Sequence, residues 1–142
     1  MAVTLKQLAD LSMGLAGTDL TDGEFVYINV PYNTASPLTM TAAVFSRRMI
    51  LKAITLNPDV AATNAVTVSA FKAASAVVLG SGVLLHSGTG NLQGTAGTNL
   101  PLTVSVVSGA LDIAAGTRIG VVVSGAIGAA GSGIVTFALS PA

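Results

Sequence analysis

Residues that could do chemistry are few in this chain, which has one histidine, His86, and no cysteine. The absence of cysteine removes disulfides, thiolate metal sites and cysteine nucleophiles. A zinc site would need three oxygen ligands beside His86, a set that zinc sites seldom use. Because His86 follows the apolar run 83–85, we interpret it as a solvated residue at the end of a strand. We predict no catalytic residue, no metal site and no cofactor.

Two further groups have residue types that could bind a phosphate or a cation. The glycines of residues 88–94 resemble a dinucleotide-binding fingerprint, but their spacing is wrong by one residue and the sequence after them cannot begin the required helix. Asp19, Asp22 and Glu24 could bind calcium, yet their spacing is not that of a known calcium loop. We therefore expect an exposed loop at the first group and a turn at the second.

The densest positive cluster consists of Arg47, Arg48 and Lys52. Strand alternation predicts that Arg48 and Lys52 share one face and that Arg47 points to the other. These cations can serve solubility and strand register, the interpretation we favour because exposed ion pairs are individually weak. Alternatively, Arg48 and Lys52 bind an acidic partner or the acidic N-terminal segment of a neighbouring copy, which makes them candidate partner-binding residues.

Charge is scarce in the whole chain, with six Lys+Arg and six Asp+Glu among 142 residues against 51% hydrophobic residues. An average domain of this length carries about 35 charged residues. The net charge of zero and the lack of a large basic patch exclude nucleic acid and anionic membranes as electrostatic partners. Since a lone soluble protein uses interspersed charge to resist association, the composition predicts a surface covered by copies of the chain or by a larger assembly.

A membrane-spanning helix is a second interpretation of the mean hydropathy of +0.77, because residues 119–142 contain no charge. Their pattern favours strands instead. Ile119, Val121 and Val123 occupy alternate positions, and a series of glycines then interrupts the run. We expect strands and turns here, and no membrane partner.

Short runs with a period of two, separated by turn residues, follow the N-terminal region and predict an all-β antiparallel sandwich of eight or nine strands. We expect a domain over residues 24–142, with a hairpin over 77–85 and an exposed loop over 87–99. Alternation places Leu38, Met40, Ala42 and Val44 on one face of their strand, and Leu102, Val104 and Val106 on one face of theirs. The expected strands are 24–30, 38–44, 49–56, 66–70, 77–79, 83–85, 102–106, 118–124 and 135–139, with a short apolar run at 111–113 before the turn 114–117.

Residues 1–23 differ from the rest and are interpreted as an N-terminal arm. Leu5, Leu8, Leu11 and Leu15 lie at roughly helical spacing, which predicts a short amphipathic helix. Such a short helix is marginal in water by itself, so it orders either by docking on a partner or by packing on its own sandwich. The four leucines are candidate partner-binding residues in the first case.

The outward positions of the predicted strands are Thr and Ser rather than Lys and Glu, so the usual charged protection of sheet edges is missing. A homo-oligomer is the simplest way to cover these edges. A ring of three would bury about 800 Å² of each subunit at each contact, and we expect a homotrimer.

The order of features, an apolar arm and then a compact sandwich with the strand-turn-strand segment 111–121 (LDIAAGTRIGV), resembles the decoration or cement proteins of tailed bacteriophage heads. The resemblance spans most of residues 24–142, and its pattern also occurs in phage fibres and other virus-like jelly rolls. It implies a jelly-roll-like trimer on the outer surface of a virion that joins copies of the major capsid protein at capsomer junctions.

Two other classes of protein remain as alternatives. A head-fibre or tail-associated phage module has the same kind of sandwich. A carbohydrate-binding module would need exposed aromatic side chains, and Phe25, Tyr27 and Tyr32 are the only ones near one another in sequence. An enzyme is the weakest class, because no nucleophile or acid–base pair has a positioned partner.

Overall fold

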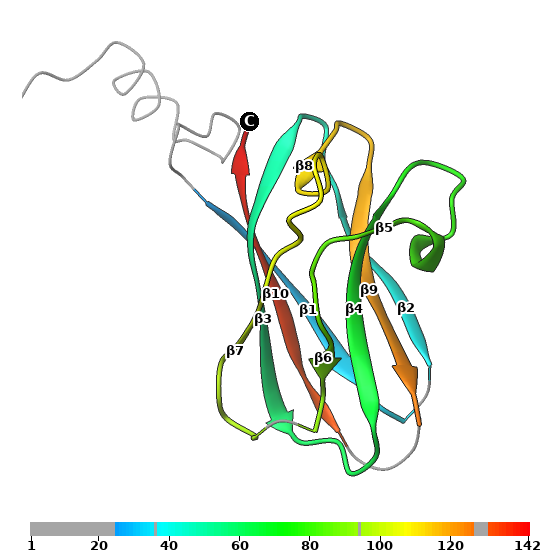
Figure 1. Ribbon diagram of the computed structural model, residues 1–142, viewed down its shortest axis with the longest axis vertical. Coiled ribbons are helices and arrows are strands. Elements are labelled where there is room, and N and C mark those ends of the chain that lie inside the picture. Colours follow the sequence, from blue (N-terminus) through cyan, green and yellow to red (C-terminus); the bar gives the residue numbers. More distant parts are fainter. Residues whose placement is uncertain (1–24, 36, 94, 127–130) are drawn as a thin grey trace, which may run out of the picture.

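The fold is a sandwich of two antiparallel β-sheets (Figure 1). The computed structural model of this chain describes residues 25–35, 37–93, 95–126 and 131–142. Sheet A contains β1 (Val26–Asn33), β10 (Ser132–Pro141), β3 (Met49–Val60), β7 (Leu100–Leu102) and β8 (Asp112–Ile113). Sheet B contains β2 (Leu38–Val44), β9 (Arg118–Gly125), β4 (Val66–Ala73), β5 (Val83–Leu84) and β6 (Gly90–Asn91). A 3₁₀ turn, η1 (Leu79–Ser81), joins β4 to β5.

The strand order is that of a jelly roll. Sheet A runs β1-β10-β3-β7 with β8 also on β3, and sheet B runs β2-β9-β4-β5 with β6 also on β4. The first four strands alternate between the sheets, and β9 and β10 return to lie between them, which is the double Greek key of a jelly roll. The predicted all-β antiparallel sandwich is therefore confirmed.

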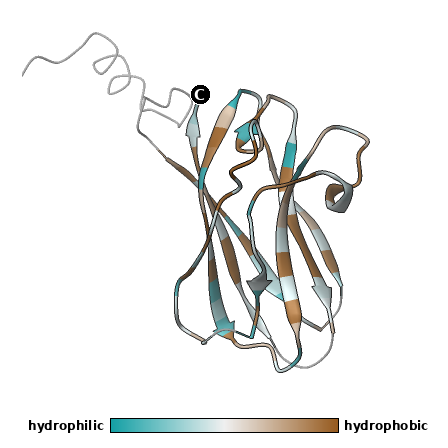
Figure 2. Cartoon of the chain, in the orientation of Figure 1, coloured by the Kyte–Doolittle hydropathy of each residue, from teal (hydrophilic) through white to brown (hydrophobic). Residues whose placement is uncertain are grey.

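The core lies between the two sheets and is built by the period of two. Figure 2 shows hydrophobic and polar residues alternating along the long strands. Phe137, in the middle of β10, is fully buried. Burying each large side chain fully contributes about 1.5–3 kcal/mol. The other largest buried side chains are Met49, Leu51, Ile54, Leu56, Leu85, Leu92, Ile113, Ile119 and Leu139.

Two strands continue through prolines at which the sequence predicted an end. β1 includes Pro31, because within the described residues it is an edge strand bonded to β10 alone, and a proline is tolerated where its missing N–H faces outward. β3 includes Pro58, whose carbonyl accepts a hydrogen bond of 2.7 Å from the N–H of Gly97 on the side away from β10. Both predicted strand ends were wrong, because a proline lacks the N–H donor on one side of its strand only and the pairing on the other side can continue.

The hairpin predicted over residues 77–85 was also wrong. Residues 79–81 form η1, and β5 pairs with β4 through Phe71 and Lys72 instead of with residues 77–79. The reason for Gly82 is close approach rather than positive φ: a Cβ there would lie 2.1 Å from the carbonyl oxygen of Lys72. The glycine allows the chain to pass directly over β4.

The loop predicted over residues 87–99 is anchored in the core. Leu92 is fully buried, and β6 pairs with β4 through Thr67 and Val68. Strand alternation also predicted inward-facing side chains at Val44 and Val106, and both are exposed. A register shift in β2 between Thr41 and Ala43 turns Val44 outward, and Val106, beyond the end of β7, is 92% exposed.

Candidate functional site

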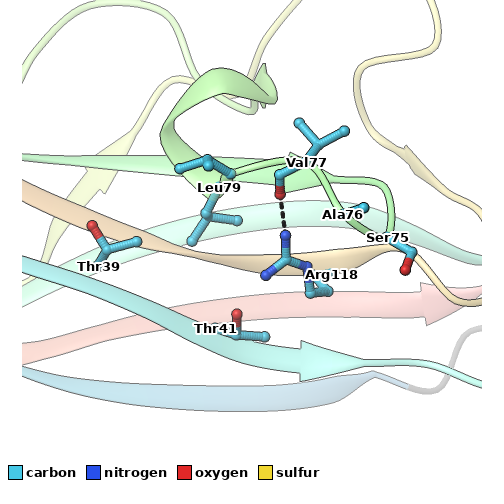
Figure 3. Close-up of a pocket in the computed structure, with 8 residues that line it drawn as sticks. Thr39, Thr41, Ser75, Ala76, Val77, Leu79 and Arg118 are labelled. Atoms are coloured by element: carbon cyan, nitrogen blue, oxygen red, sulfur yellow. Dashed lines mark hydrogen bonds between the residues drawn. The ribbon is translucent and has the colours of Figure 1, made fainter.

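A hollow of about 580 Å³ lies on the outer face of sheet B and is open to solvent (Figure 3). Its walls come from the outward side of β2, the start of β9 and the connection between β4 and η1. The strands provide hydroxyls and a guanidinium, and the connection provides mainly apolar side chains. The lining residues are Thr39, Thr41, Ser75, Ala76, Val77, Val78, Leu79 and Arg118.

Arg118 is the charged group of this hollow. It is the first residue of β9 and is paired with Val44 of β2 and Ala73 of β4, so two ladders hold its backbone. Its Nη2 donates a hydrogen bond to the carbonyl oxygen of Val77, as Figure 3 shows. Its Nε is shut off from solvent and has no hydrogen-bond partner among the described residues. A ligand in the hollow cannot reach this buried Nε, but it can use the Nη hydrogens that are not bound to Val77.

The wall opposite β2 is fixed against the sheet by tight packing. Leu79 is buried, and a Cβ at Gly120 would lie 2.7 Å from its Cδ2. The missing side chain on β9 therefore makes room for Leu79. Ala76 has a φ of 66° in the same wall, a conformation that a residue other than glycine adopts only when its surroundings impose it.

The chemistry that this hollow favours is binding of a carboxylate. A guanidinium forms paired hydrogen bonds with a planar anion, and the hydroxyls of Thr39 and Thr41 can add a donor each. Within the described residues no acidic side chain and no histidine lines the hollow, so Arg118 is not neutralised there.

His86 contradicts the predicted solvated strand end, because it is only 3% exposed. It forms an isolated antiparallel bridge with Val104, which pairs its backbone with the segment that follows β7. Neither ring nitrogen has a hydrogen bond of good geometry within the described residues. Burial lowers the pKa of His86, and the backbone of Ser87 offsets part of that effect. The ring is a neutral part of the packing at physiological pH.

Arg48 has an acidic partner within the same chain. Its Nε and Nη2 donate hydrogen bonds of 2.7 and 2.8 Å to the two carboxylate oxygens of Asp112. These hydrogen bonds raise the pKa of Arg48 and lower the pKa of Asp112. Lys72 donates hydrogen bonds of 2.5 and 2.6 Å to the carbonyl oxygens of Gly109 and Asp112, and burial lowers its pKa. These bonds join Arg48 to β8 and join Lys72 of β4 both to β8 and to Gly109 in the segment before it.

The other predicted partner-binding residues are not gathered at one place. Leu5, Leu8, Leu11 and Leu15, with the predicted arm 1–23, lie outside the described residues, and so does the acidic group at 19–24. Lys52 is exposed on β3 beside exposed Ala53 and is the residue of β3 that the register shift leaves without a partner on β10. Arg47 lies in the bend before β3. Partner binding by Arg48, Lys52 and the leucines stays a prediction.

The three aromatic residues near the N-terminal end of the domain divide between surface and core. Phe25 and Tyr27 are exposed, with ring centroids 6.1 Å apart and planes tilted by 37°. Tyr32 is buried, and its hydroxyl has no partner among the described residues. Burial, with the nearby charge of Asp59, raises its pKa. Of these three residues, only Phe25 and Tyr27 have rings that a bound sugar could stack on.

A second surface feature is the apolar end patch, which we define as Val83, Leu84, Val106 and Val107. The amide of Ser105 donates a hydrogen bond of 2.9 Å to the carbonyl oxygen of Leu85, so residues 106–107 run beside β5. All four side chains of the patch are exposed. Neighbouring exposed apolar side chains of this kind mark interaction surfaces when they form a large patch.

The described residues contain no group of three His, Cys, Asp or Glu side chains placed to hold a metal ion. Within the same residues no helix is long and apolar enough to cross a membrane, and the described parts of 119–142 are β9 and β10.

Sequence reasoning missed the hollow because its lining comes from three separate segments. One signal was present in the sequence: Arg118 begins a strand and is followed by 24 residues without charge. The neighbours of Arg118 in the hollow, however, depend on how the connection after β4 folds over the sheet.

Comparisons with known proteins add little to this geometry. No protein-family model matches the sequence, and no curated protein matches it. One similar solved structure is described as "Cyanophage Pam1 capsid asymmetric unit", with 18% identity, a TM-score of 0.47 and coverage of 82% of each chain. The function of the chain therefore has to be inferred from its own residues.

Proposed function

We propose that this chain is a structural virion protein that decorates and stabilises a phage capsid by binding as a trimer at capsomer junctions on its outer surface. The apolar end patch carries the proposal, because it offers Val83, Leu84, Val106 and Val107 to a partner on a chain that has little charge to keep surfaces apart. Covering apolar surface contributes about 25 cal/mol per Å² before the cost of association is subtracted.

The jelly roll and the resemblance to decoration proteins support the same role, although one fold hosts many functions. The described residues carry five cations and two carboxylates, and one of those carboxylates, Asp112, is engaged by Arg48. Contacts with the major capsid protein are therefore proposed to be mainly apolar. Lys52 and the leucines of segment 1–23 are proposed as additional contacts, and the proposed role includes no catalytic step.

Light scattering combined with size exclusion tests the self-association. The wild-type chain is expected at the mass of a trimer. The variant Val106→Asp with Val107→Asp places two charges in the patch and is expected to run as a smaller species. The matched control is Val60→Asp, at an exposed valine on the last position of β3, and it keeps the trimer. A wild-type monomer contradicts the trimer.

Binding to capsids tests the role itself. Heads assembled without this chain, from the phage that encodes it, are mixed with wild-type protein and sedimented, and the bound density is located by electron microscopy. Density at capsomer junctions is expected, and the Val106→Asp, Val107→Asp variant stays in the supernatant. Density on a head fibre or the tail favours the alternative phage module, and an absence of binding contradicts both.

Carbohydrate binding is a second candidate, favoured by the exposed pair Phe25 and Tyr27. Aromatic faces that are open to solvent can stack on sugar rings, whereas a core pair could not. A glycan array would show binding that Tyr27→Ala abolishes. Array binding that survives Tyr27→Ala, or no binding at all, removes this candidate.

A further inference from the structure

The hollow around Arg118 and the acidic N-terminal segment are complementary in charge. Residues 1–24 contain four carboxylates and one lysine, a net charge of −3, and residues 25–142 carry the compensating +3. Asp112, one of the two carboxylates in the described residues, is already bound by Arg48. Arg118 has no carboxylate partner within the described residues. Four of the six Asp and Glu residues of the chain lie in the N-terminal segment.

The segment also enters at the correct end of the sandwich. Val26 of β1 pairs with Leu139, and the chain then crosses to the opposite end before β2 returns. β2 contacts β1 and finishes at Val44, which pairs with Arg118. The segment that precedes β1 therefore leaves the sandwich at the end where Arg118 lies. Fifteen residues separate Asp10 from Phe25, a span of roughly 50 Å when extended, which is enough to reach the hollow.

Asp10 fits this hollow better than the other carboxylates of the segment. It is the one with a leucine within two positions on both sides, Leu8 and Leu11. The hollow offers groups complementary to these. The guanidinium of Arg118 lies among hydroxyls and can bind the carboxylate, and exposed Val77 and Val78 form an apolar margin for the leucines.

We propose that the hollow is the docking site of the N-terminal segment, with the carboxylate of Asp10 bound by the guanidinium of Arg118 and the flanking leucines against Val77 and Val78. The carboxylate accepts hydrogen bonds from the free Nη hydrogens of Arg118, and the hydroxyls of Thr39 and Thr41 donate to its remaining lone pairs. The contact forms in the purified chain without a capsid, so it holds or fails independently of the decoration role.

Cysteine cross-linking tests the contact directly, because the natural chain contains no cysteine. The full chain with Leu11→Cys and Val78→Cys is expected to form a disulfide under mild oxidation at least tenfold faster than the control with Leu11→Cys and Val60→Cys. A product with the mass of one chain places the segment on its own subunit, and a product with the mass of two places it on a second copy. Equal rates for the two pairs overturn the proposal.

Hydrogen exchange of residues 5–15 in the full chain isolates the charge pair. The substitution Asp10→Asn lies outside the described residues. It is expected to speed exchange in residues 5–15 about tenfold, the effect of losing a hydrogen bond between charged groups. Arg118→Gln gives the same increase, and the double variant adds no more. Asp19→Asn is the matched control and leaves exchange as in the wild type. If Asp10→Asn also leaves it unchanged, the hollow has another occupant and the proposal is wrong.

Discussion

The two sides of the sandwich are built in different ways. On one side lie β1 and β2, edge strands of eight and seven residues joined by long ladders to β10 and β9. On the other side lie β5, β6 and β8, each of two residues, and β7, of three. Figure 1 shows long connecting segments between these short strands.

The difference shows that two kinds of interaction stabilise this fold. The long-strand side depends on repeated cross-strand pairs, each of which contributes a little. The short-strand side has few ladder bonds and depends on single side chains inserted into the core, among them Leu85, Leu92 and Ile113, which are fully buried. The predictions below test each kind of support.

The largest effect is expected at the centre of the long ladders. Phe137→Ala removes a fully buried ring from β10, which lies between β1 and β3. The free energy of unfolding should fall by about 3–5 kcal/mol, measured by denaturant titration. A loss below about 1 kcal/mol would mean that the core does not centre on this strand.

The short-strand side is tested next by Leu92→Ala. The residue is fully buried in a segment with the composition of a loop, so its truncation should cost about 2–5 kcal/mol. Val60→Ala is the control, because Val60 is exposed at the last position of β3 and lies outside the apolar end patch, and it should change stability by no more than about 0.5 kcal/mol. Equal effects of the two substitutions would contradict the anchored-loop description.

The packing of the connection over sheet B is tested by Gly120→Ala. The new Cβ would lie 2.1 Å from the carbonyl oxygen of Met40, a backbone atom in the neighbouring strand. Such overpacking should cost about 1–3 kcal/mol of unfolding free energy. Gly80→Ala meets only Val122 Cγ2 at 3.7 Å, so the thermal midpoint of this control should stay close to the wild type.

His86 makes the short-strand side sensitive to pH. Because burial lowers its pKa in the folded state, the unfolded chain takes up a proton at a higher pH than the folded chain does. Stability is therefore full above about pH 6.5, the ordinary pKa of histidine, and falls as the pH decreases from there towards the folded-state pKa. Denaturation midpoints between pH 8 and 5 measure this slope, and His86→Gln should flatten it. A slope that persists in His86→Gln assigns the effect to other groups.

The smallest effect on stability is expected from Arg48→Gln, because the ion pair with Asp112 is exposed to solvent. The pKa of Asp112 should rise towards its ordinary value, since the hydrogen bond from Arg48 is the main cause of its lowering. In the wild type this contribution is present at neutral pH and is lost as the pH falls through the folded-state pKa. An NMR titration of Asp112 measures the change, and an unaltered pKa would contradict the ion pair.

Much of the long-strand side could be predicted from local pattern. Alternation identified β2, β4, β9 and β10 to within a few residues. The errors at Pro31 and Pro58 arose because a proline was treated as a barrier to the whole strand, whereas it removes one donor on one side. Whether that side has a partner depends on the order of the strands.

The short-strand side and the hollow could not be predicted in this way. Leu92 stands among glycine, threonine and asparagine, and His86 ends an apolar run, so neither has local neighbours that indicate burial. Both are buried because distant strands close over them. The hollow likewise exists only where the connection after β4 lies across Gly120, beside Arg118.

By itself, the sequence determined the all-β sandwich and the low number of charges, because a period of two and a scarcity of charged residues are local properties that hold in any arrangement of the strands. The tertiary structure alone decided the jelly-roll order, the burial of His86 and Leu92, and the hollow that holds Arg118. The physical reason is that burial and electrostatic pairing depend on which distant segments meet, and these meetings are fixed only when both sheets pack together.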